Sequence, residues 1–289
     1  MRAELHAAIV RRVAELRPGA AGVVLVYHRI GLPTELDRGI DAGVFRQQLR
    51  HLTRAFRVVP SANILEAARS RRGRERFPVA ITFDDDVESH VRIAAPELQA
   101  VGAPATFFLT GRTLDGPAPF WWDDLERSHR GPPSLRQAAA EIEALGPEER
   151  AARVAALRQS APPGGDPGLS RADVHELAGT FEIGFHTRTH DPVATIPDAD
   201  LPAYLENGRE ALAEAAGTPI LSFAYPHGRA DERAAAAVRA AGYDRGFTGA
   251  ATPVGAGTDR FLIPRLAAAT TLDGFRLQLA RAATAAARG

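Results

Sequence analysis

Short runs of apolar and β-branched residues recur along the chain and alternate with stretches of helical spacing. The apolar runs, which we expect to form strands, cover residues 23–28, 56–60, 79–83, 105–110, 181–186, 220–226, 245–249 and 261–266. Several are apolar at every position, as strands buried on both faces are. The helical stretches cover residues 43–54, 62–70, 91–101, 203–216 and 230–241. This alternation predicts an α/β fold with a parallel sheet, and seven or eight strands favour a barrel.

Residues 112–180 interrupt the alternation, because no convincing strand lies among them. They contain two polar stretches with helical spacing, 134–145 and 147–159, and a helix start at which Ser170 is paired with Asp173. We therefore expect residues 112–180 to form a helical insertion beside the barrel. Residues 1–289 are expected to form a single domain.

The charge balance and the absence of Cys exclude several kinds of site. The 289 residues carry 35 basic and 35 acidic side chains, and every basic one is Arg. No basic field is therefore available for nucleic acid or a membrane surface. Without Cys the chain has no disulfide, thiolate ligand or Cys nucleophile. Residues 1–22 read as an Arg-interrupted amphipathic helix, and no apolar run could span a bilayer, so we expect a cytoplasmic or peripheral protein.

Polar side chains gather at the carboxyl ends of the predicted strands. In chain order they are Tyr27, His28, Asp84, Asp85, Asp86, His186, His190, Tyr225, Pro226, His227 and Arg265. In barrels and open parallel sheets, active sites are built at this edge. Each residue alone is a weak signal, but together they predict a site.

A bound cation would explain why three carboxylates follow one another at Asp84, Asp85 and Asp86, because its charge offsets their repulsion. His186 and His190 lie four residues apart, so both imidazoles can turn to one point. An isolated pair of this spacing is more often two surface histidines, but the acidic cluster changes that balance. Two imidazoles and one carboxylate suit Zn²⁺, our first expectation, and also Co²⁺ or Ni²⁺.

The segments ITFDDD, PATFFLTG, IGFHTRTH and SFAYPHG follow one another along the chain. Together they resemble the motifs of the polysaccharide deacetylases, carbohydrate esterase family four, also called the NodB-homology domain. The resemblance runs from Val23 to Leu266. It implies a single catalytic domain with a distorted (β/α) barrel of about seven parallel strands. It also implies a divalent metal and the removal of N-acetyl, sometimes O-acetyl, groups from a polysaccharide, oligosaccharide or glycan precursor.

The resemblance also implies roles for individual residues. Asp84 matches the catalytic base, while Asp85, His186 and His190 match the metal ligands. A backbone amide that stabilises the oxyanion falls on His227. These roles are chemically coherent, since the metal activates water while Asp84 accepts its proton.

Two departures from the family pattern concern the aspartates. Asp86 stands where the family usually has Gly; we interpret it as pointing to solvent or capping the next helix, in preference to tuning the metal. Ala224 stands where many members have an Arg that pairs with the base. We expect Arg265 to reach Asp84 instead and to keep it ionised, the alternative being a surface salt bridge.

A third departure concerns the general acid. Family members often use a His in a late LxH motif, but no His follows His227 in this chain. We expect His28 to protonate the leaving group, with His227 as a second candidate; the alternative for His28 is a buried side chain bonded to backbone. Tyr225, Pro226 and Trp122 are expected to contact substrate, although a cluster such as FWW more often anchors an insertion to the core.

The leading hypothesis is therefore a metal-dependent hydrolase of an acetylated carbohydrate. A second hypothesis keeps the metal site and changes the substrate to another small amide or imide. A third is a non-catalytic carbohydrate-binding relative with a decayed site, against which the presence of both aspartates and both histidines argues. Acetate release with added metal distinguishes a hydrolase from a binding protein.

Overall fold

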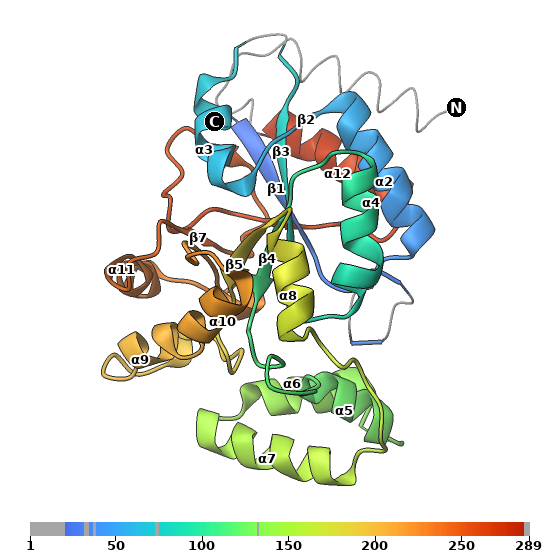
Figure 1. The fold of residues 1–289 in the computed structure, drawn as a ribbon, viewed down its shortest axis with the longest axis vertical. Coiled ribbons are helices and arrows are strands. Elements are labelled where there is room, and N and C mark those ends of the chain that lie inside the picture. Colours follow the sequence, from blue (N-terminus) through green and yellow to red (C-terminus); the bar gives the residue numbers. More distant parts are fainter. Residues whose placement is uncertain (1–20, 32–34, 37–38, 73–74, 132, 286–289) are drawn as a thin grey trace.

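A curled sheet forms the centre of the molecule (Figure 1). The computed structural model describes residues 21–31, 35–36, 39–72, 75–131 and 133–285. Among these residues nine strands join one sheet. They are β1 (Ala21–Tyr27), β2 (Arg57–Val58), β3 (Pro78–Asp84), β4 (Thr106–Leu109), β5 (Glu182–Phe185), β6 (Ser222–Ala224), β7 (Arg245–Phe247), β8 (Val254–Gly255) and β9 (Leu266–Ala267). The helix predicted at the N-terminus lies, up to residue 20, outside the described residues.

The predicted parallel sheet is confirmed, with one antiparallel addition. The strands lie in the order β7-β6-β5-β4-β3-β1-β8, and β8 alone among the described strands pairs antiparallel, with β1. The segment before β9 bridges the two sides of the curl. Ile263 pairs with Phe247 of β7, whereas Leu266 of β9 pairs with Leu25 of β1. The sheet therefore curls into a distorted barrel.

Alternating side chains divide the core into two clusters, as strands buried on both faces require. Val23 and Leu25 of β1 join the larger cluster, beneath the helices of the outer layer. Val24 joins a second cluster that also contains Ala80 and Phe108. This second cluster lies inside the curl, so the side chains that share the face of Ala80 on β3 point inward.

Helices lie around the sheet and at one end of the molecule (Figure 1). They are α2 (Ala42–Ala55), α3 (Ile64–Ser70), α4 (Ala95–Ala100), α5 (Trp121–Ser128), α6 (Leu135–Ala144), α7 (Pro147–Ser160), α8 (Arg171–Ala178), α9 (Leu201–Glu206), α10 (Arg209–Ala216), α11 (Glu232–Ala240) and α12 (Leu272–Ala285). A π-helical turn, His90–Ala94, leads into α4. Asp41 caps α2 by accepting from two backbone amides, and the predicted capping box of Ser170 and Asp173 begins α8.

The segment 112–180 is helical, as expected, and none of its described residues is in a strand. Figure 1 shows α5, α6 and α7 grouped together at one end of the molecule. Leu125 of α5, Ile142 of α6 and Leu157 of α7 form a small core of their own. That the whole chain is a single domain stays a prediction.

Three details of the helices differ from the sequence prediction. Residues 203–216 are divided into α9 and α10, because Gly208 adopts a left-handed conformation with φ 90°. Helices α5 and α12 were not predicted from the pattern of apolar positions.

No helix in the described part of the chain is long and apolar enough to cross a membrane.

Candidate active site

Asp84, the last residue of β3, faces the interior of the curl. It lies two residues after Thr82, on the same face of the strand. Nη1 of Arg265 lies 2.5 Å from Asp84 Oδ1, and Nη2 lies 2.7 Å from Oδ2. Arg265 is itself buried and donates through Nε to the carbonyl oxygen of Thr248 at 3.1 Å. The contact expected between Arg265 and Asp84 is therefore present, as a two-pronged buried ion pair.

The pKa of Asp84 results from two opposed effects. Burial raises it, but the positive charge of Arg265 and, more weakly, that of His186 once protonated at low pH lower it, so the pKa falls to about 2. Two hydrogen bonds from Arg265 also favour the ionised form. Asp84 is therefore a carboxylate at neutral pH, as a proton acceptor must be.

Asp85, His186 and His190 form the cluster predicted from the sequence. One ligand atom of each lies within 4.8 Å of the others. Asp85 Oδ1 is 3.3 Å from His190 Nε2 and 3.9 Å from His186 Nε2. Asp85 and His190 both have positive φ, 76° and 60°. Such strained residues gather at functional sites, where the surrounding structure holds them in place.

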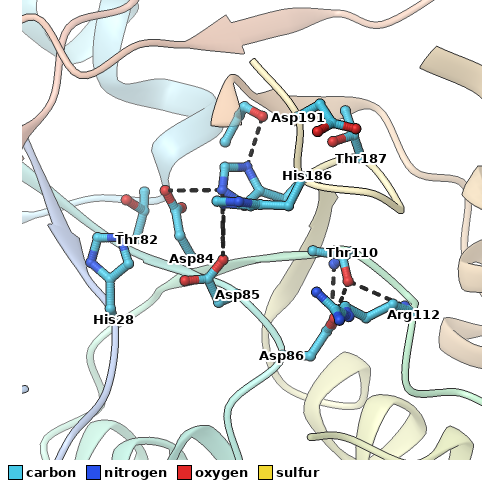
Figure 2. A network of polar contacts seen from close by, with 12 residues as sticks. His28, Thr82, Asp84, Asp85, Asp86, Thr110, Arg112, His186, Thr187 and Asp191 are labelled. Atoms are coloured by element: carbon cyan, nitrogen blue, oxygen red, sulfur yellow. Dashed lines mark hydrogen bonds and ion pairs between the residues drawn. The ribbon is translucent and has the colours of Figure 1, made fainter. Parts of the chain in front are cut away.

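The donor atoms of this cluster fit a divalent cation. Nδ1 of His186 donates to the carbonyl oxygen of Ala224 at 2.8 Å, which leaves the Nε2 lone pair directed at the aspartates (Figure 2). Burial lowers the pKa of His186 to about 4 and that of His190 well below its usual value. Both rings are therefore neutral at pH 7, the form that binds a metal. Two imidazoles and one carboxylate match Zn²⁺, Co²⁺ or Ni²⁺.

His227 lies in a tight turn beside the cluster, and its ring centroid is 4.7 Å from that of His190. The turn is strained at His227, which has φ 56°, whereas Gly228 has φ 67°, a conformation that Gly adopts readily. Gly228 also accepts a hydrogen bond from Gly249 N at 2.8 Å. A Cβ at Gly228 would lie 2.5 Å from the Cα of Gly249. Only Gly therefore allows the two backbones to approach this closely.

Tyr225 and Pro226, which were expected to contact substrate, are buried instead. The Tyr225 ring is fully buried, and its hydroxyl donates to the carbonyl oxygen of Phe261 at 3.0 Å. Neither residue is among those that line the cavity described below. The expectation for their side chains is therefore wrong. Both support the turn that carries His227.

A cavity of about 720 Å³ opens over these residues. His28, which follows β1, lines it together with Asp84, Asp85 and His227. The carbonyl oxygen of His28 accepts a hydrogen bond from Nε2 of buried His90 at 3.1 Å. His28 is half-buried, so its ring is not the fully buried one of the alternative interpretation. His90 escaped the sequence analysis, although it stands only a few residues after the aspartates.

Trp122 forms part of the cavity wall. Its ring stacks on Phe120, with centroids 4.2 Å apart, and meets the edge of His190 at 5.2 Å. Phe120 is buried whereas Trp122 is half-buried. Phe120 therefore belongs to the core, whereas Trp122 has a ring face on which a ring of a bound ligand could stack.

Asp86 differs from its expected role. It is buried, and its carboxylate accepts hydrogen bonds from Thr110 N at 3.1 Å, from the Thr110 hydroxyl and from Gly111 N at 3.4 Å. Figure 2 shows it beside Thr110 and Arg112, away from His186. Burial raises the pKa of Asp86. Neither solvent exposure nor helix capping is correct, because the side chain ties the end of β3 to the residues after β4.

Comparisons with known proteins agree with this geometry. A family model described as polysaccharide deacetylase matches residues 71–246. A search of curated proteins found no match. His28 and Arg265 lie outside the residues matched by the family model.

Several solved structures share the fold. The Streptococcus pyogenes deacetylase PplD, in complex with acetate, is 14% identical, with a TM-score of 0.65 over 90% of this chain and 98% of that chain. IcaB from Ammonifex degensii is 22% identical, with a TM-score of 0.64 over 93% of this chain and 98% of that chain. A de-N-acetylase from Aggregatibacter actinomycetemcomitans is 17% identical, with a TM-score of 0.59 over 88% and 99%.

These structural likenesses concern the fold, while the family model covers well over half of the sequence and includes the three aspartates, His186, His190 and the turn of His227. The chain therefore belongs to the polysaccharide deacetylase family, whose members are hydrolases of carbon–nitrogen bonds.

Proposed function

We propose that the protein is a metal-dependent deacetylase that removes N-acetyl, or O-acetyl, groups from a polysaccharide, oligosaccharide or glycan precursor. One observation carries the proposal. The carboxylate of Asp84, held by Arg265, faces the Asp85, His186 and His190 cluster inside a cavity, with Asp84 Oδ2 3.7 Å from His186 Nε2. A proton acceptor and a metal-ligand set thus lie side by side.

Asp85, His186 and His190 would hold the cation, with Zn²⁺ as the first choice and Co²⁺ or Ni²⁺ as alternatives. When bound, it supplies a Lewis acid for the acetyl carbonyl and for water. The protein prepares this site by keeping both imidazoles neutral and by fixing the His186 ring against the carbonyl oxygen of Ala224.

Asp84 acts as the general base and accepts the proton of the attacking water. Its pKa of about 2 makes it a weak base. It would therefore take a proton from a water whose own pKa the cation lowers, rather than from bulk water. Arg265 fixes both carboxylate oxygens, so the base cannot rotate away from the cavity. Thr82 completes this support, because Nη1 of Arg265 also lies 3.3 Å from its hydroxyl.

Two other parts of the chain, the turn of His227 and the segment of His28 after β1, are proposed to act on the developing oxyanion and on the leaving group. The backbone amide of His227, in its left-handed turn, is the proposed oxyanion donor. His28 is the proposed general acid for the leaving nitrogen, with the His227 ring as the second candidate; both rings belong to residues that line the cavity. Trp122 is the proposed wall for a sugar ring.

Acetate release from N-acetylglucosamine oligomers, measured together with metal content, tests the proposal. Wild type should bind one divalent ion per chain and release acetate. Asp84→Asn should retain the ion and lose release, whereas His190→Gln should lose both. Binding of oligomers without acetate release, in metal-loaded wild type, would favour a non-catalytic carbohydrate-binding protein. Release from a small amide but from no sugar would favour the second hydrolase hypothesis.

A further inference from the structure

We propose that a second cavity, adjoining the active-site cavity, binds an anionic group of the substrate, a phosphate or a carboxylate. This inference rests on the proposed deacetylase function. The second cavity has a volume of about 500 Å³. Five residues line both cavities: Trp121, Glu143, His190, His227 and Arg229. An anion held in the second cavity would therefore lie next to the metal-ligand histidine.

The lining of this cavity is strongly basic, although the chain as a whole has equal numbers of acidic and basic residues. The basic side chains come from four separate segments: Arg112, Arg150, Arg158, Arg188 and Arg229. The acidic side chains in the lining are Glu143 and Asp191. The cavity lining is therefore more positive than the chain as a whole, and this favours the binding of an anion.

Two of these arginines are committed to holding the helical insertion. Nη1 of Arg150 pairs with Asp191 at 2.8 Å, and its other nitrogens donate to three backbone carbonyl oxygens. Nε of Arg158 is 3.4 Å from Asp124, and its Nη2 donates to the carbonyl oxygen of Pro119. Arg150 neutralises one of the two carboxylates in the lining. Both arginines therefore serve mainly to hold the helical insertion in place, and their charge in the cavity is a secondary contribution.

The other three arginines keep donor capacity for a ligand. Arg112 lies over the Phe120 ring at 4.3 Å and donates to a backbone carbonyl oxygen, and no ion pair involves it among the described residues. Nη2 of Arg188 lies 3.8 Å from Asp115, and its Nη1 makes a long hydrogen bond of 3.4 Å to the carbonyl oxygen of Gly111. Arg229 is exposed, and its guanidinium has no ion pair within the part of the chain that the structure describes.

Burial lowers the pKa of Arg112, yet the group keeps its charge because Arg ionises far above neutral pH. Asp86 attracts it electrostatically without forming an ion pair. The guanidinium of Arg112, half-buried at the wall of the cavity, lies over the Phe120 ring and is held by the carbonyl oxygen of Pro119, while its planar fork offers paired N–H groups. That geometry matches the paired oxygens of phosphate or carboxylate.

The substrate class follows from the position of the cavity. Trp121, His190 and His227 form the boundary between the two cavities, so a sugar in the first can place a substituent, or the next unit of a chain, in the second. The inferred substrate is an acetylated sugar that bears a phosphate or a carboxylate close to the acetyl group. A neutral acetylated glycan would leave the arginines unused.

Anion binding to the chelator-treated protein tests the site independently of catalysis, since no metal is then present to attract the anion. The probes are inorganic pyrophosphate and glucuronate, titrated by calorimetry. We expect binding of one or both to weaken roughly tenfold in Arg188→Gln/Arg229→Gln, the size of one charged hydrogen bond. The matched control is Arg153→Gln, on the exposed surface of α7 and outside both cavities. Absence of binding, or equal binding in the double variant, would overturn the proposal.

The same variants separate this inference from the proposed function. The measurement compares kcat/KM for an anionic substrate, N-acetylglucosamine 1-phosphate or an oligomer containing a uronic acid, with kcat/KM for a neutral N-acetylglucosamine oligomer. The ratio of the first to the second should exceed one. The ratio should fall about tenfold in the double variant and stay constant in Arg153→Gln. Acetate release without any preference for the anionic substrate would reject the anion site alone. Anion binding without acetate release would reject the deacetylase function alone.

Discussion

Arg265 and Asp84 are 181 residues apart in the sequence and share two hydrogen bonds inside the curled sheet. Removing one partner of such a buried pair leaves the other charge unpaired. We expect Arg265→Gln to lower the free energy of unfolding by about 3–5 kcal/mol. Denaturant unfolding followed by circular dichroism measures this change.

Arg276→Gln is the control for this prediction, because Arg276 pairs with the exposed Asp273 at 3.4 Å on α12. Its loss should cost less than about 1 kcal/mol. Arg265→Lys keeps the charge but loses the two-pronged contact, so acetate release should fall at least about tenfold even where the protein stays folded. Equal stability of wild type and Arg265→Gln would contradict the role assigned to the pair.

Metal binding by Asp85, His186 and His190 should stabilise the folded protein, since the three ligand atoms meet only in the fold. Zn²⁺ at about one hundred times its dissociation constant should add roughly 3 kcal/mol. Calorimetric melting with and without Zn²⁺ measures this as a rise in Tm for wild type. Asp84→Asn should show the same rise and His190→Gln should not; a rise in all three would place the ion elsewhere.

The sequence predicted the edge of the sheet where the site lies, because several of the apolar runs end in polar residues. Asp84, Asp85, His186 and His190 come together at that edge, since parallel strands end on the same side. The departure from the family pattern at Ala224, together with the place of Arg265 at the end of the last predicted strand, could also propose Arg265 as the partner of Asp84, but only as one of two alternatives. The choice depends on the strand pairing near β9, which is a long-range contact.

The role of Asp86 shows why other details could not be predicted. Asp84 lies opposite Phe108 in the register of β3 and β4, so Asp86 falls opposite Thr110 beyond the strand ends. Nothing local to the aspartates reveals that register. The burial of Tyr225 has a similar cause, since its partner Phe261 lies 36 residues away. Both errors concern side chains whose surroundings are set by distant segments.

His90 should make the stability of the protein sensitive to acid. Burial lowers its pKa to about 4, against 6.5 for an ordinary His. Between these values the unfolded chain binds the proton more tightly, so stability is complete above pH 6.5 and is lost as the pH falls towards 4. The contribution amounts to roughly 3 kcal/mol.

His90→Gln can keep a side-chain donor for the carbonyl oxygen of His28 but cannot titrate. Urea unfolding at several pH values should show a smaller loss of stability between pH 6.5 and 4 in this variant than in wild type. His175→Gln, on the exposed face of α8, should behave as wild type does. If the pH profile of His90→Gln has the same slope as that of wild type, His90 is not a source of acid sensitivity.

Substituting two glycines with similar φ distinguishes the effect of backbone strain from the effect of a steric contact at the active site. Gly228 has φ 67° and Gly217, at the end of α10, has φ 68°. A Cβ at Gly228 would meet the backbone of Gly249, whereas a Cβ at Gly217 would meet nothing within 4 Å. Gly217→Ala should therefore cost about 1 kcal/mol of stability and leave acetate release unchanged.

Gly228→Ala carries the same strain and also pushes the turn of His227 away from Gly249. Because the proposed oxyanion donor is a backbone amide in this turn, acetate release should fall by about 10²-fold or more while the metal content stays constant. Acetate assays and metal analysis on both variants give the comparison. Full activity of Gly228→Ala would mean that the position of this turn does not govern catalysis, and the oxyanion donor would then have to be sought in another segment.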